Sequence, residues 1–137
     1  ASLIKYNKKG LKLKKKIFKN TFNTENDLCL IENEINMNGP AVVSFAIRDV
    51  IPEIMALSKN VNCIFSHQAG KIVMNQLQKK IDKKIFFPLN YNNHGNLVST
   101  SIPLLIKQNL KKFKTEKKLL LCGFGVGLST SIILFHR

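Results

Sequence analysis

The stretch LLLCGFGVGLSTSIILF, residues 119–135, decides the fold class of this 137-residue chain. Its two ends are uncharged apolar runs, and three glycines lie between them. Two buried strands joined by a glycine loop have this pattern, so we predict a hairpin near the carboxyl terminus. A membrane-anchoring tail is the alternative, because the run reaches the lower length limit of a spanning helix and Gly123 and Gly127 form a GxxxG pair.

Helical and strand patterns alternate upstream of this hairpin. A start signal at Asn38-Gly39-Pro40 opens a helix that Pro52 should kink or break. Residues 68–80 have the pattern of an amphipathic helix with Ile72, Val73, Leu77 and Ile81 inward, and a further helix near Ser99 should turn Leu105 and Leu110 inward. Strands are expected at 11–14, 62–65 and 86–90. The order predicts an α/β fold, a mixed sheet with flanking helices.

The charge of the chain is strongly positive. It has 22 Lys and Arg against 8 Asp and Glu, a formal net charge of +14, and the first nineteen residues contain no acid. Such a charge favours an acidic partner. The basic segment has no aromatic interleaving and no helix-turn-helix or zinc pattern, so we expect a solvated basic hairpin turning at Gly10 and no nucleic-acid partner.

The three cysteines do not form a metal or disulfide pattern. Cys29, Cys63 and Cys122 are widely spaced in apolar surroundings, as reduced core thiols of a cytoplasmic protein would be. A metal site of Cys63 with His67 would lack two of the four ligands that zinc usually takes, so no metal and no cofactor are expected. The lysine-rich start lacks the continuous apolar segment of a signal peptide, so no signal peptide is predicted either.

Three short motifs carry the candidate chemistry: SHQAG (66–70), NHGN (93–96) and GFGVG (123–127). The first two follow predicted strands, and side chains from different strand ends can converge on one crevice. The third does not open a helix, which argues against a dinucleotide-binding loop. A single His or Asn-Gly turn is usually structural, and we assign that part to His94.

At these motifs the chain resembles the β-ketoacyl-ACP synthase III family of the thiolase superfamily over residues 36–137. SHQAG is similar to the His-Gln-Ala-Asn segment of that family, NHGN to its Gly-Asn segment, and GFGVG to its glycine loop. The segments 36–39 and 45–48 resemble the entry of its mid-chain helix. The resemblance implies the carboxy-terminal half of a thiolase-like fold, with residues 1–35 as a basic hairpin and connection and residues 36–137 as the domain.

The resemblance also implies a Cys-His-Asn site for decarboxylative Claisen condensation, in fatty acid or polyketide-type biosynthesis. His67 and Asn96 would bond the carbonyl of a malonyl thioester, and the backbone N–H of Val126 would form part of an oxyanion hole. Phe124 would line the acyl pocket. The positions expected to contact the carrier are Gln68, Ala69, Gly70, Lys71 and Ile72.

Two departures bear on these roles. Gly70 stands where the family usually has Asn, and LSTS (128–131) replaces a usual Thr-Trp-Gly. The nucleophilic cysteine belongs to the family's first half, which this chain lacks, so the chain alone should be inactive. The alternative is a non-catalytic module that binds acyl carriers or acyl-CoA.

The expected partners follow from the same resemblance. They are acyl-CoA and malonyl-ACP thioesters, the missing amino-terminal half and an acidic acyl carrier protein. The carrier protein would face Lys71, Lys79, Lys80 and Lys107. No membrane partner is expected. A half of such a fold should expose an apolar face, and homodimerisation through that face is expected.

Overall fold

The predicted carboxy-terminal hairpin forms the centre of a four-stranded sheet. In the computed structural model, which describes residue 5 and residues 8–137, strand β5 (Lys118–Gly125) runs antiparallel to β6 (Ser129–His136). No helix in these residues is long and apolar enough to cross a membrane. The hairpin prediction is confirmed, and the tail-anchor alternative is wrong because residues 119–135 are two strands and their loop.

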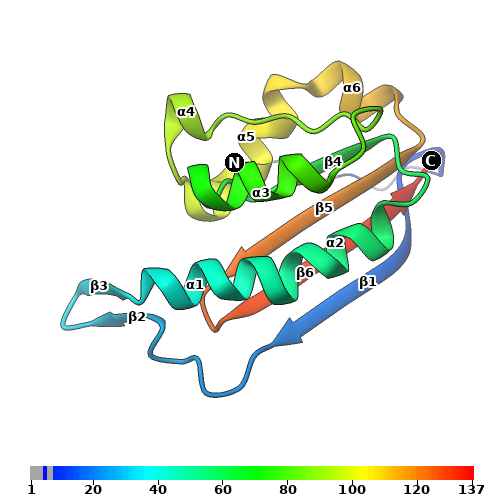
Figure 1. Cartoon of the computed structure of the whole chain (residues 1–137). Coiled ribbons are helices and arrows are strands. Elements are labelled where there is room, and N and C mark those ends of the chain that lie inside the picture. The colour runs from blue at the N-terminus through cyan, green and yellow to red at the C-terminus, as the bar shows by residue number, and fades with distance from the viewer. Residues whose placement is uncertain (1–4, 6–7) are drawn as a thin grey trace.

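The sheet has the order β1-β6-β5-β4 and is mixed, as predicted (Figure 1). Strand β4 (Cys63–Ser66) is parallel to β5, whereas β1 (Lys12–Asn20) is antiparallel to β6 and bulges between Leu13 and Lys15. The first strand of the predicted basic hairpin lies outside the described residues. What the structure shows is that β1 pairs with the far end of the chain.

The strand predicted at 86–90 is wrong. Of residues 86–90, only Phe86 pairs with β4, through a single bridge to Cys63. The physical reason is Pro88, which has no N–H to donate to a ladder.

One long helical segment begins where the sequence predicts. The side chain of Asn38 accepts a hydrogen bond from the N–H of Ala41 and caps α1 (Gly39–Phe45). A π-helical turn, Ala46–Val50, and α2 (Ile51–Ser58) follow without a break. Contrary to the predicted break, the helical segment continues through Pro52. This is possible because Pro52 lies in the first turn of α2 and the wider π turn precedes it.

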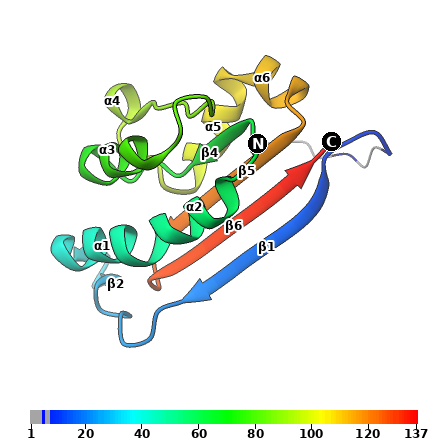
Figure 2. The same ribbon diagram turned by 45° about the vertical axis from the view of Figure 1, so that its right-hand side comes forward.

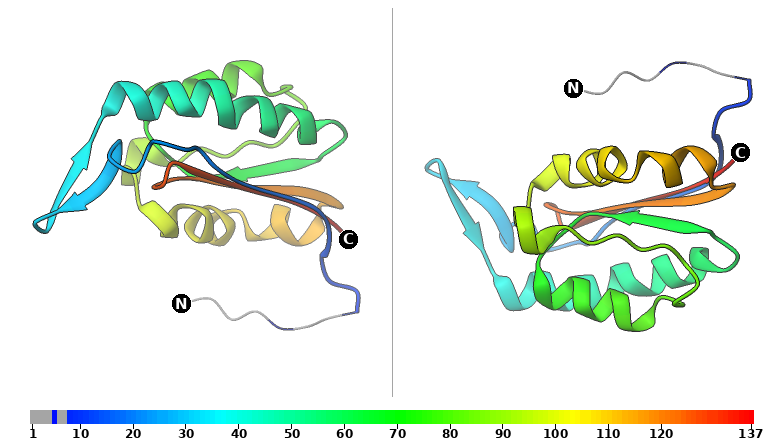
Figure 3. Two further views of the ribbon diagram at one scale, coloured as in Figure 1. Left: turned by 90° about the horizontal axis from the view of Figure 1, so that it is seen from below. Right: turned by 90° about the horizontal axis from the view of Figure 1, so that it is seen from above.

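Helices pack on both faces of the sheet. Figure 3 shows α1, α2 and α3 (Lys71–Lys80) over one face and α5 (Ser101–Gln108) with α6 (Leu110–Thr115) over the other. The short helix α4 (Tyr91–His94) and a 3₁₀ turn, Val98–Thr100, connect α3 to α5. The β2–β3 hairpin (Leu28–Ile31 and Glu34–Met37) projects beyond the end of the sheet (Figures 1 and 2).

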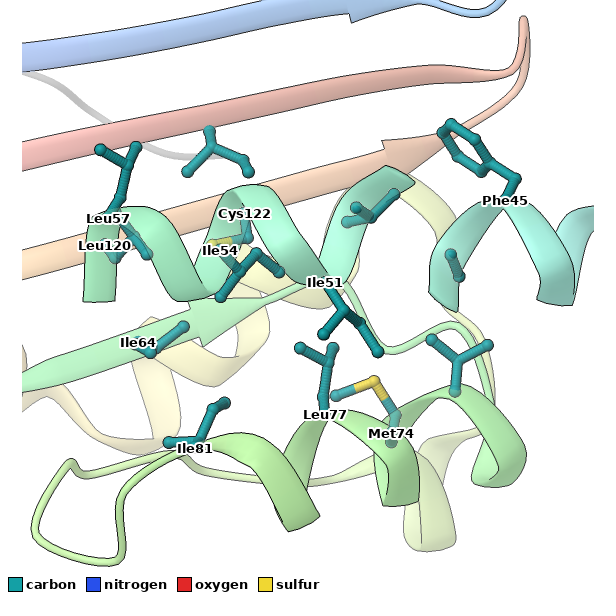
Figure 4. Packing of buried hydrophobic residues seen from close by; sticks show 14 of the residues in the cluster. Phe45, Ile51, Ile54, Leu57, Ile64, Met74, Leu77, Ile81, Leu120 and Cys122 are labelled. Atoms are coloured by element: carbon teal, nitrogen blue, oxygen red, sulfur yellow. The ribbon is translucent and has the colours of Figure 1, made fainter. Parts of the chain in front are cut away.

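The main core lies between the sheet and the helices α1 to α3. Ile54, Leu77 and Leu120 meet there with no exposed surface (Figure 4). A second cluster under α5 and α6 contains Phe65, Leu105 and Leu119.

Two of the inward positions predicted on helices are wrong. Ile72 is 63% exposed, because α3 begins at Lys71 and buries Val73, Met74 and Leu77 instead. Leu110 is 44% exposed, because Asn109 separates α5 from α6 and the helical face does not continue through it.

Candidate functional site

His67 lies directly after β4, at the carboxyl ends of the parallel strands β4 and β5. Its backbone N–H donates to the carbonyl of Cys122 at 2.7 Å, which extends the pairing of the two strands by one residue. Its ring meets Phe124 edge to face, with centroids 5.3 Å apart and an interplanar angle of 83°. Both contacts hold the imidazole against β5.

Asn96 reaches the same region from the loop that follows helix α4. Helix α4 ends at Gly95, whose φ of +66° turns the backbone into the Asn96 loop. The side-chain Oδ1 of Asn96 accepts a hydrogen bond from the N–H of Val98 at 2.9 Å. Because the oxygen is engaged, the amide nitrogen of Asn96 remains the donor of this side chain.

Val98 lies beside both candidate residues. Its N–H holds the side chain of Asn96, and its backbone favours the charged form of the His67 ring. Val98 has a φ of +49°, which is strained for a β-branched residue. Strained backbone persists where the surroundings enforce it, and it gathers at functional sites. Sequence reasoning missed Val98, although an Asn two residues ahead is the signal of such a turn.

The pKa of His67 is lowered from its usual value near 6.5. Burial of the ring is the larger cause, since burial disfavours the charged form, and the backbone of Val98 partly offsets it. The ring is therefore neutral at pH 7 and carries one N–H.

A cavity of about 740 Å³ brings these side chains together. His67, Asn96 and Val98 form part of its wall with Phe124 and Val126. Most of its surface is apolar, which suits an alkyl chain or another apolar ligand better than a charged one.

The β2–β3 hairpin forms the opposite wall. The register pairs Leu28 with Met37 and Leu30 with Ile35, so these four side chains share one face, and that face lines the cavity. Cys29 also lines the cavity and is half-buried, so its predicted place in a core is wrong, whereas Cys63 and Cys122 are buried free thiols as predicted. The hairpin was not part of the predicted site.

The glycine loop lies at the end of β5. Gly125 and Gly127 have φ values of +156° and +128°, which only glycine adopts readily, and Val126 lies between them. Ser129 donates its hydroxyl to the carbonyl of Val126 at 2.7 Å. The hydroxyl of Thr24 accepts from the N–H of Leu128 at 2.7 Å and lies 3.0 Å from the carbonyl of Gly127, so a distant loop fixes this turn. Nothing in the sequence indicates this part for Thr24.

The predicted carrier-contacting positions differ in exposure. Lys71 and Ile72 are exposed at the start of α3, and Ala69 and Gly70 are half-buried before it. Gln68 is fully buried and its side chain bonds within the protein, so it offers no surface to a carrier. Within the described part of the chain, no three His, Cys, Asp or Glu side chains gather as metal ligands would.

Known proteins share both this sequence pattern and this fold. The family model described as 3-oxoacyl-[acyl-carrier-protein (ACP)] synthase III C terminal matches residues 56–136, more than half of the chain. Among curated relatives, the β-ketoacyl-[acyl-carrier-protein] synthase III of Streptococcus agalactiae is 31% identical over 75% of this chain and 36% of its own length. That of Streptococcus gordonii is 32% identical over 81% of this chain and 37% of its own length.

Solved structures show the same arrangement. The β-ketoacyl-[acyl carrier protein] synthase III of Thermus thermophilus superposes with a TM-score of 0.82 and 18% identity, over 95% of this chain and 47% of that one. The 3-oxoacyl-[acyl-carrier-protein] synthase III of Aquifex aeolicus gives 0.80 and 22% identity, over 96% and 46%. The chain thus spans about a third to a half of these proteins, and its fold is thiolase-like. On its matched sequence and fold, the chain belongs to the 3-oxoacyl-[acyl-carrier-protein] synthase III family, as a carboxy-terminal domain.

Proposed function

We propose that this chain supplies the two hydrogen-bond donors of a decarboxylative Claisen condensation. The observation that carries the proposal is that His67 and Asn96 line one cavity, in which Val98 engages the Oδ1 of Asn96 and leaves its amide nitrogen as the donor. Both donors are uncharged at pH 7, which suits a carbonyl oxygen that becomes negative only as the reaction proceeds.

The proposed step begins with a malonyl thioester in the cavity. The carbonyl oxygen of the thioester accepts hydrogen bonds from His67 and from the amide nitrogen of Asn96. A neutral imidazole carries one N–H, which His67 donates to this oxygen. Loss of CO₂ leaves the electron pair of the broken C–C bond on the enolate, which the two donors stabilise.

The enolate carbon then attacks an acyl group held as a thioester on a cysteine outside this chain. A C–C bond forms, the cysteine thiolate leaves, and the backbone N–H of Val126 stabilises the oxyanion of the intermediate. Phe124 lines the acyl pocket in this proposal. Ala69, Gly70, Lys71 and Ile72 form the rim that meets an acyl-CoA or an acidic acyl carrier protein, while the buried Gln68 supports the rim from below.

An uncovered part of the sheet supports the proposal that a further half completes the enzyme. Ile17 of β1 packs into the main core, so its neighbour Phe18 points to the opposite face, where it is 61% exposed. Ile133 and Phe135 of β6 lie on that face too, because Ile133 pairs with Leu121, which contacts the second cluster. Apolar area left open in this way marks an interaction surface. We propose that the amino-terminal half covers it, and that the complete protein is a cytoplasmic homodimer.

The test uses the full-length gene product that carries this chain. Incubation with acyl-CoA should give an acyl adduct on an upstream cysteine, seen by mass spectrometry and lost in its Cys→Ala variant. His67→Ala and Asn96→Ala should keep the adduct but slow decarboxylation of the malonyl thioester by about 10²–10³ each. Binding of acyl-CoA without any adduct would refute the condensation and favour the non-catalytic module.

A further inference from the structure

A buried side-chain amide joins the His67 loop to helix α4. Gln68 donates from Nε2 to the carbonyl of Ser66 at 3.1 Å. Its Oε1 accepts from the backbone N–H groups of Asn90 at 2.9 Å and Tyr91 at 3.3 Å. Reversing this amide would oppose N–H groups to N–H groups in a site closed to water, so it has one orientation.

Two more amides extend this connection to His94. Asn90 donates from Nδ2 to Oε1 of Gln108, in the last turn of α5, at 3.0 Å. The Nε2 of Gln108 lies 3.1 Å from Nε2 of His94. Since the oxygen of Gln108 is engaged by Asn90, its nitrogen faces the ring, and His94 accepts at an unprotonated Nε2. A neutral His94 therefore carries its hydrogen on Nδ1.

The Asn96 loop has few other attachments. Residues 92–96 are exposed, and α4 is a single turn that buries no residue. His94 lies two residues before Asn96, with only Gly95 between them. The amide chain therefore supplies a connection that apolar packing does not supply here.

We infer that Gln68, Asn90, Gln108 and His94 form a positioning chain that holds the Asn96 loop at a fixed place relative to His67. The inference rests on the proposed function, in which both side chains must reach one carbonyl oxygen. An error of about 1 Å in such an arrangement costs on the order of 10²-fold in rate. The four residues touch no reacting atom; they act through His67 and Asn96.

The test uses Gln108, the exposed residue of the positioning chain, whose side-chain amide accepts from Asn90 and donates to His94. Gln108 is exposed, so its substitution should leave the chain folded. In ¹⁵N NMR spectra of the chain, His94 should carry its hydrogen on Nδ1. In Gln108→Glu, the carboxylate accepts from both neighbours, so the hydrogen should move to Nε2 while the side-chain amide signals of Asn96 stay in place. In Gln108→Met, both bonds are lost and the Asn96 signals should shift.

Tyr91→Phe is the matched control. It removes a hydrogen bond of 3.2 Å between the Tyr91 hydroxyl and Asn75 at the same short helix, but no member of the positioning chain. It should leave the tautomer of His94 and the signals of Asn96 unchanged. An unchanged tautomer in Gln108→Glu, or an equal shift of Asn96 in Tyr91→Phe and Gln108→Met, would overturn the inference.

Kinetics of the full-length protein separate positioning from binding. Gln108→Met should lower kcat for decarboxylation of a malonyl thioester by about 10-fold with KM changed less than about twofold, because the donors are displaced while the rim is intact. Gln108→Glu should restore kcat. If the unsubstituted protein decarboxylates nothing, the proposed function fails, and the NMR result still decides whether the chain holds Asn96. An equal kcat in all three proteins would refute the positioning role.

Discussion

Gly127→Ala tests the backbone on which the proposed oxyanion donor depends. Gly127 has a φ of +128°, and a Cβ added there would lie 3.2 Å from Cβ and 3.3 Å from the backbone nitrogen of Ser129. An L side chain in this region of φ costs on the order of 1–3 kcal/mol. The contact adds to this cost because Ser129 is held in its pairing with Gly125. We expect the free energy of unfolding to fall by about 2–3 kcal/mol.

Urea denaturation and thermal unfolding of the chain measure this loss. The expected fall in Tm is about 8–10 °C for a domain of this size. Gly123→Ala is the matched control, since Gly123 lies in β5 and an added Cβ meets only the carbonyl oxygen of Ser131, at 3.9 Å. That variant should be unchanged or more stable by up to about 1 kcal/mol. Equal stability of the two variants would mean that the loop around Val126 has another backbone conformation, and the proposed oxyanion donor would lose its support.

Three other predictions concern thiols, the imidazole and the open sheet face. Iodoacetamide should label Cys29 in the folded chain, whereas Cys63 and Cys122 should react only after unfolding. Burial raises the pKa of Cys63 to about 12 and also raises the pKa of Cys122. Mass spectrometry counts the adducts. Because burial lowers the pKa of His67, the unfolded chain binds a proton at this ring more readily than the folded chain does. The free energy of unfolding, measured in urea, should therefore fall as the pH drops from about 6.5 through the folded-state pKa. His67→Gln should remove the share of this fall that is due to His67. Phe18→Ser should change the free energy of unfolding by less than about 0.5 kcal/mol but weaken self-association of the isolated chain through the open sheet face, seen by sedimentation.

The sequence predicts the elements whose signals are local. The glycine-separated apolar runs of 119–135 are enough for the hairpin, and Asn38 with Pro40 is enough for the start of α1. The helix that continues past Pro52 depends on a π turn, which has no sequence signature of its own. The pairing of β1 with β6 joins residues more than a hundred positions apart, and no local pattern specifies it.

The candidate site is predictable to a similar depth. Short motifs identify both residues, but only His67 lies after a predicted strand that forms; Asn96 follows helix α4, because the strand predicted at 86–90 does not form. The residues that orient them are not visible in this way. Val98 acts through its backbone and Thr24 through a contact across about a hundred residues, so neither needs a particular neighbour in sequence.

The cavity wall shows why this site needs another surface. Leu30 and Ile35, which line the cavity from the β2–β3 hairpin, are 66% and 77% exposed. Donors such as His67 and Asn96 stabilise a developing charge far better in a site closed to water than in an open one. The same side chains that make the cavity apolar therefore leave it open unless a further surface covers the hairpin. Under the proposed function, the amino-terminal half would both close the cavity and supply the cysteine. We therefore expect the isolated chain to bind an apolar ligand weakly and to catalyse nothing.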